Sequence, residues 1–251
     1  MARFKVRDRS KSLQLNGSTQ YASISDAAQS GLDVGSNDFA IGGWFRLVDD
    51  GAIQMLMAKY SGTSYANSTS GLGWELMYRG DQATKRLQLR VNNGSGSGAT
   101  VQSDYASYNN IADWNWHHIV GVIDRTNGKG IIYIDGVNST FNDFDDISAE
   151  TGTYSNSGDL FIGLQSGTGS SNHITGYAQD CFLVDFGAGD IPTDLNVFVS
   201  DVYYRDKFPT TIVSKWNLDD AATDSVGSND LTLTGAPSYS TERKFSARSS
   251  V

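Results

Sequence analysis

Carboxylates are the side chains of this sequence best suited to covalent chemistry, and the reaction they would serve is glycoside hydrolysis. A retaining glycosidase needs two carboxylates roughly 5 Å apart that flank the scissile bond. The chain has three glutamates, no two close enough in sequence to share a strand: Glu75, Glu150 and Glu242. The adjacent pairs Asp145-Asp146 and Asp219-Asp220 would point to opposite faces of a strand. We therefore expect no catalytic pair of acids and no enzymatic activity.

The histidines and the cysteine predict no catalytic or zinc site. His117 and His118 stand in an apolar run, which is typical of hydrogen-bonded structural histidines. His173 lies in a Gly/Ser segment without a cysteine or carboxylate at zinc-like spacing. A serine triad needs a base and an orienting acid, and the many serines single out no candidate. The lone cysteine, Cys181, excludes an intramolecular disulfide and is expected to be a small buried hydrophobe.

Calcium is the one metal for which the sequence offers ligands, because calcium takes six to eight oxygen atoms from carboxylates and carbonyls. The candidates are the run Asn142-Asp143-Phe144-Asp145-Asp146 and the pair Asp180 and Asp185. The chain has no patterned EF-hand loop, and the competing interpretation is that these are solvated surface carboxylates. The sequence alone leaves the metal site undecided.

Tryptophans are the candidate platforms for a sugar ring. Trp44, Trp74 and Trp114 could each stack against a ligand, but they also fall at strand positions that a core needs. Both interpretations stay open at this stage. Trp116 is expected to be buried at the base of a hairpin.

Composition favours a β protein. Only 39% of the 251 residues are hydrophobic, and 27 glycines accompany abundant Ser, Thr, Asn and Asp, as in short strands joined by turns. Three prolines and little 3.6-residue periodicity argue against a helical architecture. No apolar run is long enough to span a membrane, and the basic N-terminus lacks the apolar segment of a secretory signal.

Charge is unevenly distributed along the chain. Both ends are basic, through Arg3, Lys5, Arg7, Arg9 and Lys11 and through Arg243, Lys244 and Arg248. Without these ends, 11 basic and 26 acidic residues remain in a body of net charge −15. An acidic body repels nucleic acid and anionic membranes, so we expect neither partner. If the ends lie together, they form a basic pole that could dock on an acidic shell protein or a neighbouring protomer.

The segment around which the chain is organised covers residues 113–137. Two strands, at 116–123 and 130–135, flank a turn at Asn127-Gly128, which supplies the positive φ of a tight hairpin. Apolar residues fall on both alternating faces, with Ile119 on one and Val120 on the other. A strand that is wetted on one side would not show this pattern, so the hairpin is predicted to lie centrally in a layered β structure.

Other segments also have the pattern of strands. Residues 12–25 predict a hairpin around Asn16-Gly17, and 37–50 a strand with Phe39, Ile41, Phe45 and Leu47 on one face and Trp44 on the other. Residues 72–91 predict a hairpin, 159–163 a strand and 174–186 the last core strand. Residues 92–104 and 141–158 are expected to be loops, and 190–204 a short helical or extended segment.

The order Trp-His-His, a β run, a turn and Tyr-Ile-Asp-Gly-Val resembles laminin-G-like domains of the concanavalin A-like lectin/glucanase superfamily, similar to those in bacteriophage and bacterial proteins. The resemblance implies an all-β, two-sheet antiparallel jelly-roll sandwich. Glucanases of this fold carry Glu-x-Asp-x-x-Glu on one strand, which is missing here. Some laminin-G-like domains hold calcium at the sandwich rim.

The C-terminal part departs from the order of the family. Residues 213–235 resemble the segment that normally begins such a domain, yet here they stand last. A circularly permuted domain is favoured over a truncated second repeat, because a lone first strand could not bury its apolar face. We expect residues 1–251 to form one domain, with a basic arm at 1–11 and a basic tail at 236–251.

Three functions remain possible. The first is a non-catalytic structural or display module on a bacteriophage virion, such as a capsid decoration or tail protein. The second is a carbohydrate-binding or adhesion module of a secreted or surface protein, and the last is a glycoside hydrolase. The expected partners are shell or tail proteins, cell-surface glycans, or further copies of the chain.

Overall fold

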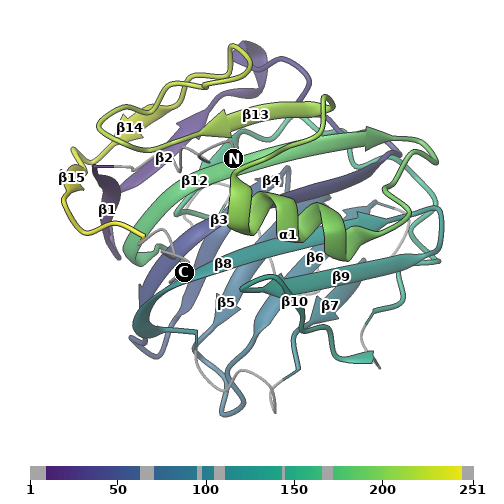
Figure 1. The fold of residues 1–251 in the computed structure, drawn as a ribbon, viewed down its shortest axis with the longest axis horizontal. Coiled ribbons are helices and arrows are strands. Elements are labelled where there is room, and N and C mark those ends of the chain that lie inside the picture. The colour runs from purple at the N-terminus through teal and green to yellow at the C-terminus, as the bar shows by residue number, and fades with distance from the viewer. Residues whose placement is uncertain are drawn as a thin grey trace, which may run out of the picture.

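The computed structural model describes residues 10–62, 71–94, 98–104, 111–142, 145–165 and 172–244. Within these ranges the strands form two antiparallel sheets, of eight and seven strands, packed face to face (Figure 1). The first sheet has the order β10 (Val137–Asn138), β9 (Lys129–Ile134), β8 (Asp113–Asp124), β3 (Asp38–Val48), β12 (Thr175–Gly187), β1 (Ser12–Asn16) and β15 (Ser238–Ser240), and β13 (Ile212–Trp216) also pairs with β12. The second has the order β14 (Thr232–Thr234), β2 (Tyr21–Ile24), β11 (Leu160–Ile162), β4 (Ile53–Tyr60), β5 (Leu72–Arg79), β6 (Leu87–Asn93) and β7 (Ala99–Gln102). The predicted two-sheet sandwich is confirmed.

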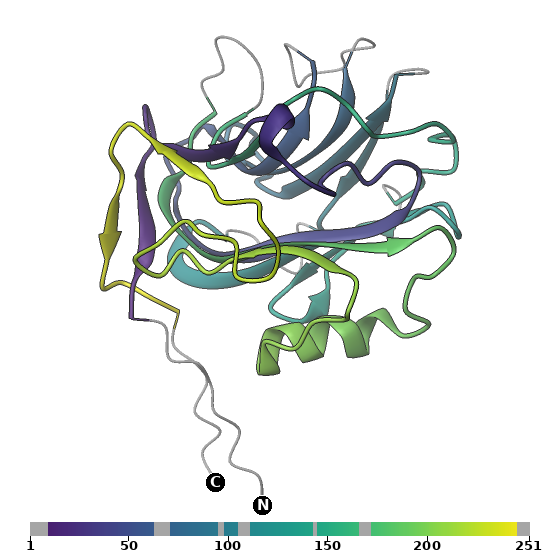
Figure 2. The same ribbon diagram turned by 90° about the horizontal axis from the view of Figure 1, so that it is seen from above.

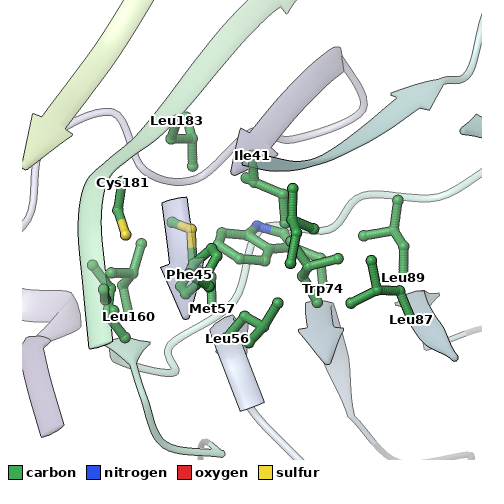
Figure 3. Packing of buried hydrophobic residues seen from close by; sticks show 14 of the residues in the cluster. Ile41, Phe45, Leu56, Met57, Trp74, Leu87, Leu89, Leu160, Cys181 and Leu183 are labelled. Atoms are coloured by element: carbon green, nitrogen blue, oxygen red, sulfur yellow. The ribbon is translucent and has the colours of Figure 1, made fainter. Parts of the chain in front are cut away.

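Alternation along the strands builds the core between the sheets. The β3 residues Phe39, Ile41, Phe45 and Leu47 all face the other sheet and are fully buried, as predicted. Figure 3 shows Ile41 and Phe45 meeting side chains of the opposite sheet around Trp74. Cys181 of β12 joins the same cluster, and burial raises the pKa of its thiol. Each large side chain removed from water here contributes about 1.5–3 kcal/mol.

A second apolar cluster lies on the outer face of the eight-stranded sheet, under helix α1 (Leu195–Arg205). Figure 2 shows the helix on the outside of this sheet. Asp194 begins the helix by accepting hydrogen bonds from the backbone N–H groups of Asn196 and Val197. Phe198, Val199 and Val202 form its buried side. The helix therefore covers only one part of that face, which determines where the sheet remains accessible.

The central hairpin is formed by β8 and β9, as predicted. Its turn uses Gly128 at φ +66°, and the backbone N–H of Gly128 donates to the Arg125 carbonyl. The Asp38 carboxylate holds the same turn by accepting from the N–H groups of Arg125 and Thr126. The hairpin is therefore anchored to β3 as well as to its own turn.

Two predictions about local pairing are wrong. Residues 12–25 do not form a hairpin, because β1 pairs with β12 and β15 while β2 pairs with β11 and β14 in the other sheet. The Asn16 side-chain oxygen accepts hydrogen bonds from the backbone N–H groups of Ser18, Thr19 and Gln20. These N–H groups therefore need no partner on a paired strand, and the chain can cross from one sheet to the other there. Residues 99–102 are also not loop: they add β7 to the edge of β6.

The C-terminal residues contribute to both sheets. β13 pairs with β12, β14 with β2, and β15 with β1, where Ser12 lies opposite Ser240. Within residues 213–235, β13 and β14 thus belong to the two sheets of the sandwich. None of the helices in the described ranges has the length and apolarity to span a membrane.

Candidate functional site

The three glutamates lie in separate environments. Glu75, on β5, is 2% exposed, and burial raises its pKa to about 7, although the charge of Arg90 and a hydrogen bond from Gln165 lower it. Glu150 accepts a hydrogen bond from the backbone N–H of Asn93, 2.9 Å away. Glu242 follows β15 and pairs with Arg46. The three glutamates therefore have separate sets of partners in the described residues.

The carboxylates of the two adjacent aspartate pairs also have partners within the chain. The Asp145 carboxylate lies 2.8 Å from Lys129 Nζ, and Asp146 accepts from the backbone N–H of Ser148. Asp219 accepts from the N–H groups of Ser10 and Lys11, while Asp220 pairs with Lys11 Nζ at 2.9 Å. These contacts fix loops and the start of β1.

The calcium candidates do not converge. Asp143 and Phe144 lie outside the described residues, and Asp145 and Asp146 are engaged as above. Asp180 lies 2.7 Å from Lys244 Nζ, whereas Asp185 accepts two hydrogen bonds from the Asn37 side chain. In the part of the chain that the structure describes, no three His, Cys, Asp or Glu side chains gather as metal ligands.

The adjacent histidines have opposite environments. His118 is buried on the outer face of β8 between Trp44, Phe182 and Tyr203, and burial lowers its pKa to about 3. His117 bridges two carboxylates, with Nδ1 2.7 Å from Asp135 and Nε2 3.2 Å from Asp113. Burial alone would lower the His117 pKa, but the two carboxylates outweigh it and raise the pKa. His173 is buried beside Tyr21.

The three candidate tryptophan platforms are used differently. Trp74 is 1% exposed and lies at the centre of the core (Figure 3). Trp44 is also buried: it stacks on Tyr203 at 5.3 Å, and Lys244 Nζ lies 4.8 Å from its ring centroid. Trp114 is 44% exposed. Of the three, Trp114 alone presents a ring to solvent.

A bulge in β8 directs Trp114 outward. Arg46 pairs with Trp116, but Val48 pairs with Asp113, so β8 carries one extra residue between these pairs. Trp114 sits there at φ +68°, a left-handed conformation that costs a bulky residue about 1–3 kcal/mol. Arg46 Nε donates to the Trp114 carbonyl at 2.8 Å, and Asn115 binds the Asp113 carboxylate through its backbone and its side chain. These contacts hold a strained, exposed aromatic residue in one place.

Trp114, Trp116, Tyr177 and Arg46 together form what we call the aromatic ledge, on the outer face of the eight-stranded sheet. Trp116, Arg46 and Tyr177 stand side by side on β8, β3 and β12. The Arg46 guanidinium lies 4.3 Å from the Trp114 ring centroid and 5.6 Å from that of Tyr177. The Tyr177 ring lies 5.7 Å from Trp114 and 6.2 Å from Trp116.

The prediction that Trp116 is buried is wrong, since it is only half-buried. It lies on the outer face of β8, two residues before His118, on the part of the sheet that the α1 cluster does not include. Its indole Nε1 is nevertheless shielded from water and has no hydrogen-bond partner. An unpaired buried donor of this kind costs about 1–3 kcal/mol.

Carboxylates border the ledge. Asp113 adjoins Trp114, Asp135 lies behind His117, and Glu242 reaches Arg46 from the C-terminal segment. Burial tends to raise the Asp113 pKa, but hydrogen bonds from Asn115 and His117 outweigh this and lower it. Sequence reasoning found Trp114 but missed Tyr177, Arg46 and Glu242. The outward alternation of β3 and β12 marks the first two, whereas nothing in the sequence indicates that Glu242 meets Arg46.

The basic ends are partly neutralised where the structure describes them. Lys11 pairs with Asp220 and Lys244 with Asp180. Arg3, Lys5, Arg7, Arg9 and Arg248 lie outside the described residues. Docking through a basic pole therefore stays a prediction.

Comparison with known proteins places this geometry in context. A profile of the concanavalin A-like lectin/glucanases superfamily matches residues 16–181, while no curated protein matches the chain. A protein from Bacteroides ovatus that is described as carbohydrate-binding shares 12% identity at a TM-score of 0.55, over 92% of this chain and 60% of its own. The heptameric SAP-like pentraxin of Limulus polyphemus shares 12% at 0.55, over 90% and 95%. The enzymatically active domain of bacteriophage CBA120 tailspike protein 2 shares 15% at 0.56, over 87% and 35%.

These three structures share only 12–15% of their residues with this chain. At such low identities they show a common fold and no more. The chain spans less than two thirds of the Bacteroides protein and about a third of the tailspike chain.

Proposed function

This chain belongs to the concanavalin A-like lectin/glucanase superfamily, and from that membership we propose that it is a non-catalytic module that binds glycans on the aromatic ledge. The observation that carries the proposal is Trp114, an exposed aromatic ring held in a strained conformation at a bulge. Strain of this kind tends to persist at functional sites, because the surrounding structure must hold it there.

The chemistry of the ledge suits a sugar. A pyranose has one face of C–H groups, which packs on an aromatic ring, and an edge of hydroxyls, which need hydrogen-bond partners. Trp114 supplies the ring, and the Asp113 carboxylate beside it supplies an acceptor for hydroxyls. Similarity to the Bacteroides protein supports the same interpretation.

The placement of the three glutamates supports the non-catalytic part of the proposal. Glu75 has the raised pKa of a general acid, yet the residues that act on it are Arg90 and Gln165. Glu150 and Glu242 are committed to Asn93 and Arg46. Incubation with a panel of oligosaccharides should therefore release no shorter products, and release that depends on Glu75 would contradict this part of the proposal.

The location that we propose for the module is the surface of a bacteriophage particle, as a capsid decoration or tail-associated protein. Similarity to the phage tailspike domain supports this context, and similarity to the heptameric pentraxin supports assembly into oligomers. Detection of the chain in purified virions by mass spectrometry tests the location. Its absence from particles would favour a secreted or surface adhesion module.

The ledge is tested by one substitution and a matched control. Trp114→Ala should weaken binding to the best ligand of a glycan array at least about tenfold, because the stacking surface is lost. Tyr204→Ala removes another exposed aromatic ring, which is 64% exposed on α1 and is not one of the ledge residues, and should leave binding unchanged. Equal affinity of Trp114→Ala and the wild type would show that the ligand binds elsewhere.

A further inference from the structure

We infer that the aromatic ledge selects uncharged glycans over anionic ones, and that Glu242 is the residue that sets this specificity. The inference rests on the proposed glycan-binding function and adds the chemical class of the ligand. It depends on how the charges around Trp114 are paired, which can be followed contact by contact.

Arg46 is the cation in contact with the Trp114 ring, and it would be the natural partner for the carboxylate of an acidic sugar. Its Nε is already used by the Trp114 carbonyl, and its Nη1 is used by the Glu242 carboxylate. A guanidinium recognises an incoming carboxylate best when it can offer two parallel N–H groups. Nε and Nη1 lie on different edges of the guanidinium, so each of the two edges that could hold a carboxylate has one N–H group already engaged.

Glu242 is held in place by the segment that carries it. The Glu242 carbonyl accepts a hydrogen bond from Ser12 Oγ, and two residues later the Lys244 N–H donates to the Gln179 side chain. Lys244 Nζ pairs with Asp180 on β12. The C-terminal segment is therefore fastened to the outer face on both sides of Glu242, and its carboxylate faces Arg46 as a built part of the ledge.

Two further carboxylates border the ledge among the described residues, those of Asp113 and Asp135. Asp113 adjoins the ring, and its lowered pKa keeps it ionised at neutral pH. His117 lies between Asp113 and Asp135, so this group carries at least one net negative charge even when the imidazole is protonated. Arg46 and Glu242 cancel each other. An anionic sugar meets like charge within the screening length of about 8–10 Å, whereas neutral hydroxyls find acceptors.

The test uses matched glycan pairs that differ only in charge. N-acetyllactosamine, its sialylated form and its sulfated form are titrated against the full chain by calorimetry. The wild type should bind the neutral member at least about fivefold more tightly than either anionic form. Glu242→Gln keeps the size of the side chain and removes its charge, which leaves the Nη1–Nη2 edge of Arg46 open to a competing carboxylate. This variant should gain at least about fivefold in affinity for the anionic forms, with the neutral glycan within about twofold.

Asp201→Asn is the control, because it removes a carboxylate of α1 that is not part of the ledge. This carboxylate pairs with Arg205 and Lys207. It should keep the wild-type preference. Tighter binding of a sialylated or sulfated glycan by the wild type, or an unchanged ratio in Glu242→Gln, would overturn the inference and leave glycan binding intact. If no neutral or anionic glycan binds the wild type, the proposed function fails and the inference fails with it.

Discussion

The ammonium of Lys59 lies 2.9 Å from the carboxylate of Asp26, at a position where only 1% of the lysine side chain is exposed. Asp33 contributes a second carboxylate oxygen at 3.0 Å, and the carbonyls of Asn156 and Gly158 lie 2.9 Å away. Four oxygen atoms from two loops therefore surround one nitrogen, in the way that they would surround a metal ion. We call this arrangement the Lys59 cage.

Replacing Lys59 should be among the most destabilising single changes in the chain. Lys59→Met keeps the apolar stem but leaves two carboxylates without their cation, and we expect a loss of about 3–5 kcal/mol of unfolding free energy. Lys85→Met, which breaks the more exposed pair with Asp49, should cost about 0–1 kcal/mol. Urea titration of both variants measures the difference. Similar losses for the two would show that the buried cage has no special weight.

Calcium should leave the stability of the wild type unchanged. The cage already holds an ammonium, and the Asp180, Asp185, Asp145 and Asp146 carboxylates have partners of their own. Thermal unfolding in EDTA and in about 5 mM CaCl2 should give the same midpoint, because a ligand that bound the folded state would raise it. A rise of several degrees with calcium would locate a metal site that these contacts do not anticipate.

Glu75 should make the protein less stable as the pH rises. Burial raises its pKa from 4.5 to about 7, so between these values the folded state keeps a proton that the unfolded chain releases. Stability then falls as pH rises through this range and levels off above it. Glu75→Gln removes this loss and should gain on the order of 1–3 kcal/mol relative to the wild type between pH 4 and pH 8. Parallel stability curves for the two proteins would contradict the assignment.

Two tryptophans should respond differently to truncation. Trp74→Ala opens a cavity in the core and should cost about 3–5 kcal/mol of unfolding free energy. Trp116→Ala should cost only about 1–2 kcal/mol, since this ring is half-buried on the outer face and its N–H has no partner to lose. Denaturant titration compares them directly. An equal cost would mean that the ledge is packed as tightly as the core.

Removal of residues 210–251 should abolish soluble expression. The deletion takes away β13, β14 and β15, which exposes the edges of β12, β2 and β1. It also removes the buried Trp216, so the core residues that pack against this ring become exposed. Unpaired edges and exposed apolar surface promote aggregation. A stable, soluble product would show instead that the C-terminal residues are a separate unit.

The sequence predicted those parts of the fold that depend on local alternation. The two faces of β3 and the β8–β9 hairpin follow from period-two patterns and an Asn-Gly turn, and both are present. The crossing between β1 and β2 could not be predicted, because an Asn-Gly turn fits a hairpin and a sheet-to-sheet connection equally well locally.

The site was less predictable than the fold. Trp114 could be named from its type, but its exposure depends on a bulge and on how far α1 extends over the sheet. The pairing of Arg46 with Glu242 joins residues 196 positions apart, and no local pattern records it. The sequence around Lys59 is that of an ordinary strand, and it does not show that two loops distant in sequence supply the partners of this ammonium.

The pairing of Ser12 with Ser240 has a mechanical consequence. Because β1 and β15 are antiparallel, the chain enters β1 and leaves β15 at the same end of their ladder. Tension between the two ends would load these hydrogen bonds one after another, as in a zipper, so β15 should detach at low force. Glu242 lies between Ser240 and the pulled end, and its contact with Arg46 would break before the ladder does. Pulling on the termini would thus expose the Arg46 charge while the rest of the sandwich stays folded.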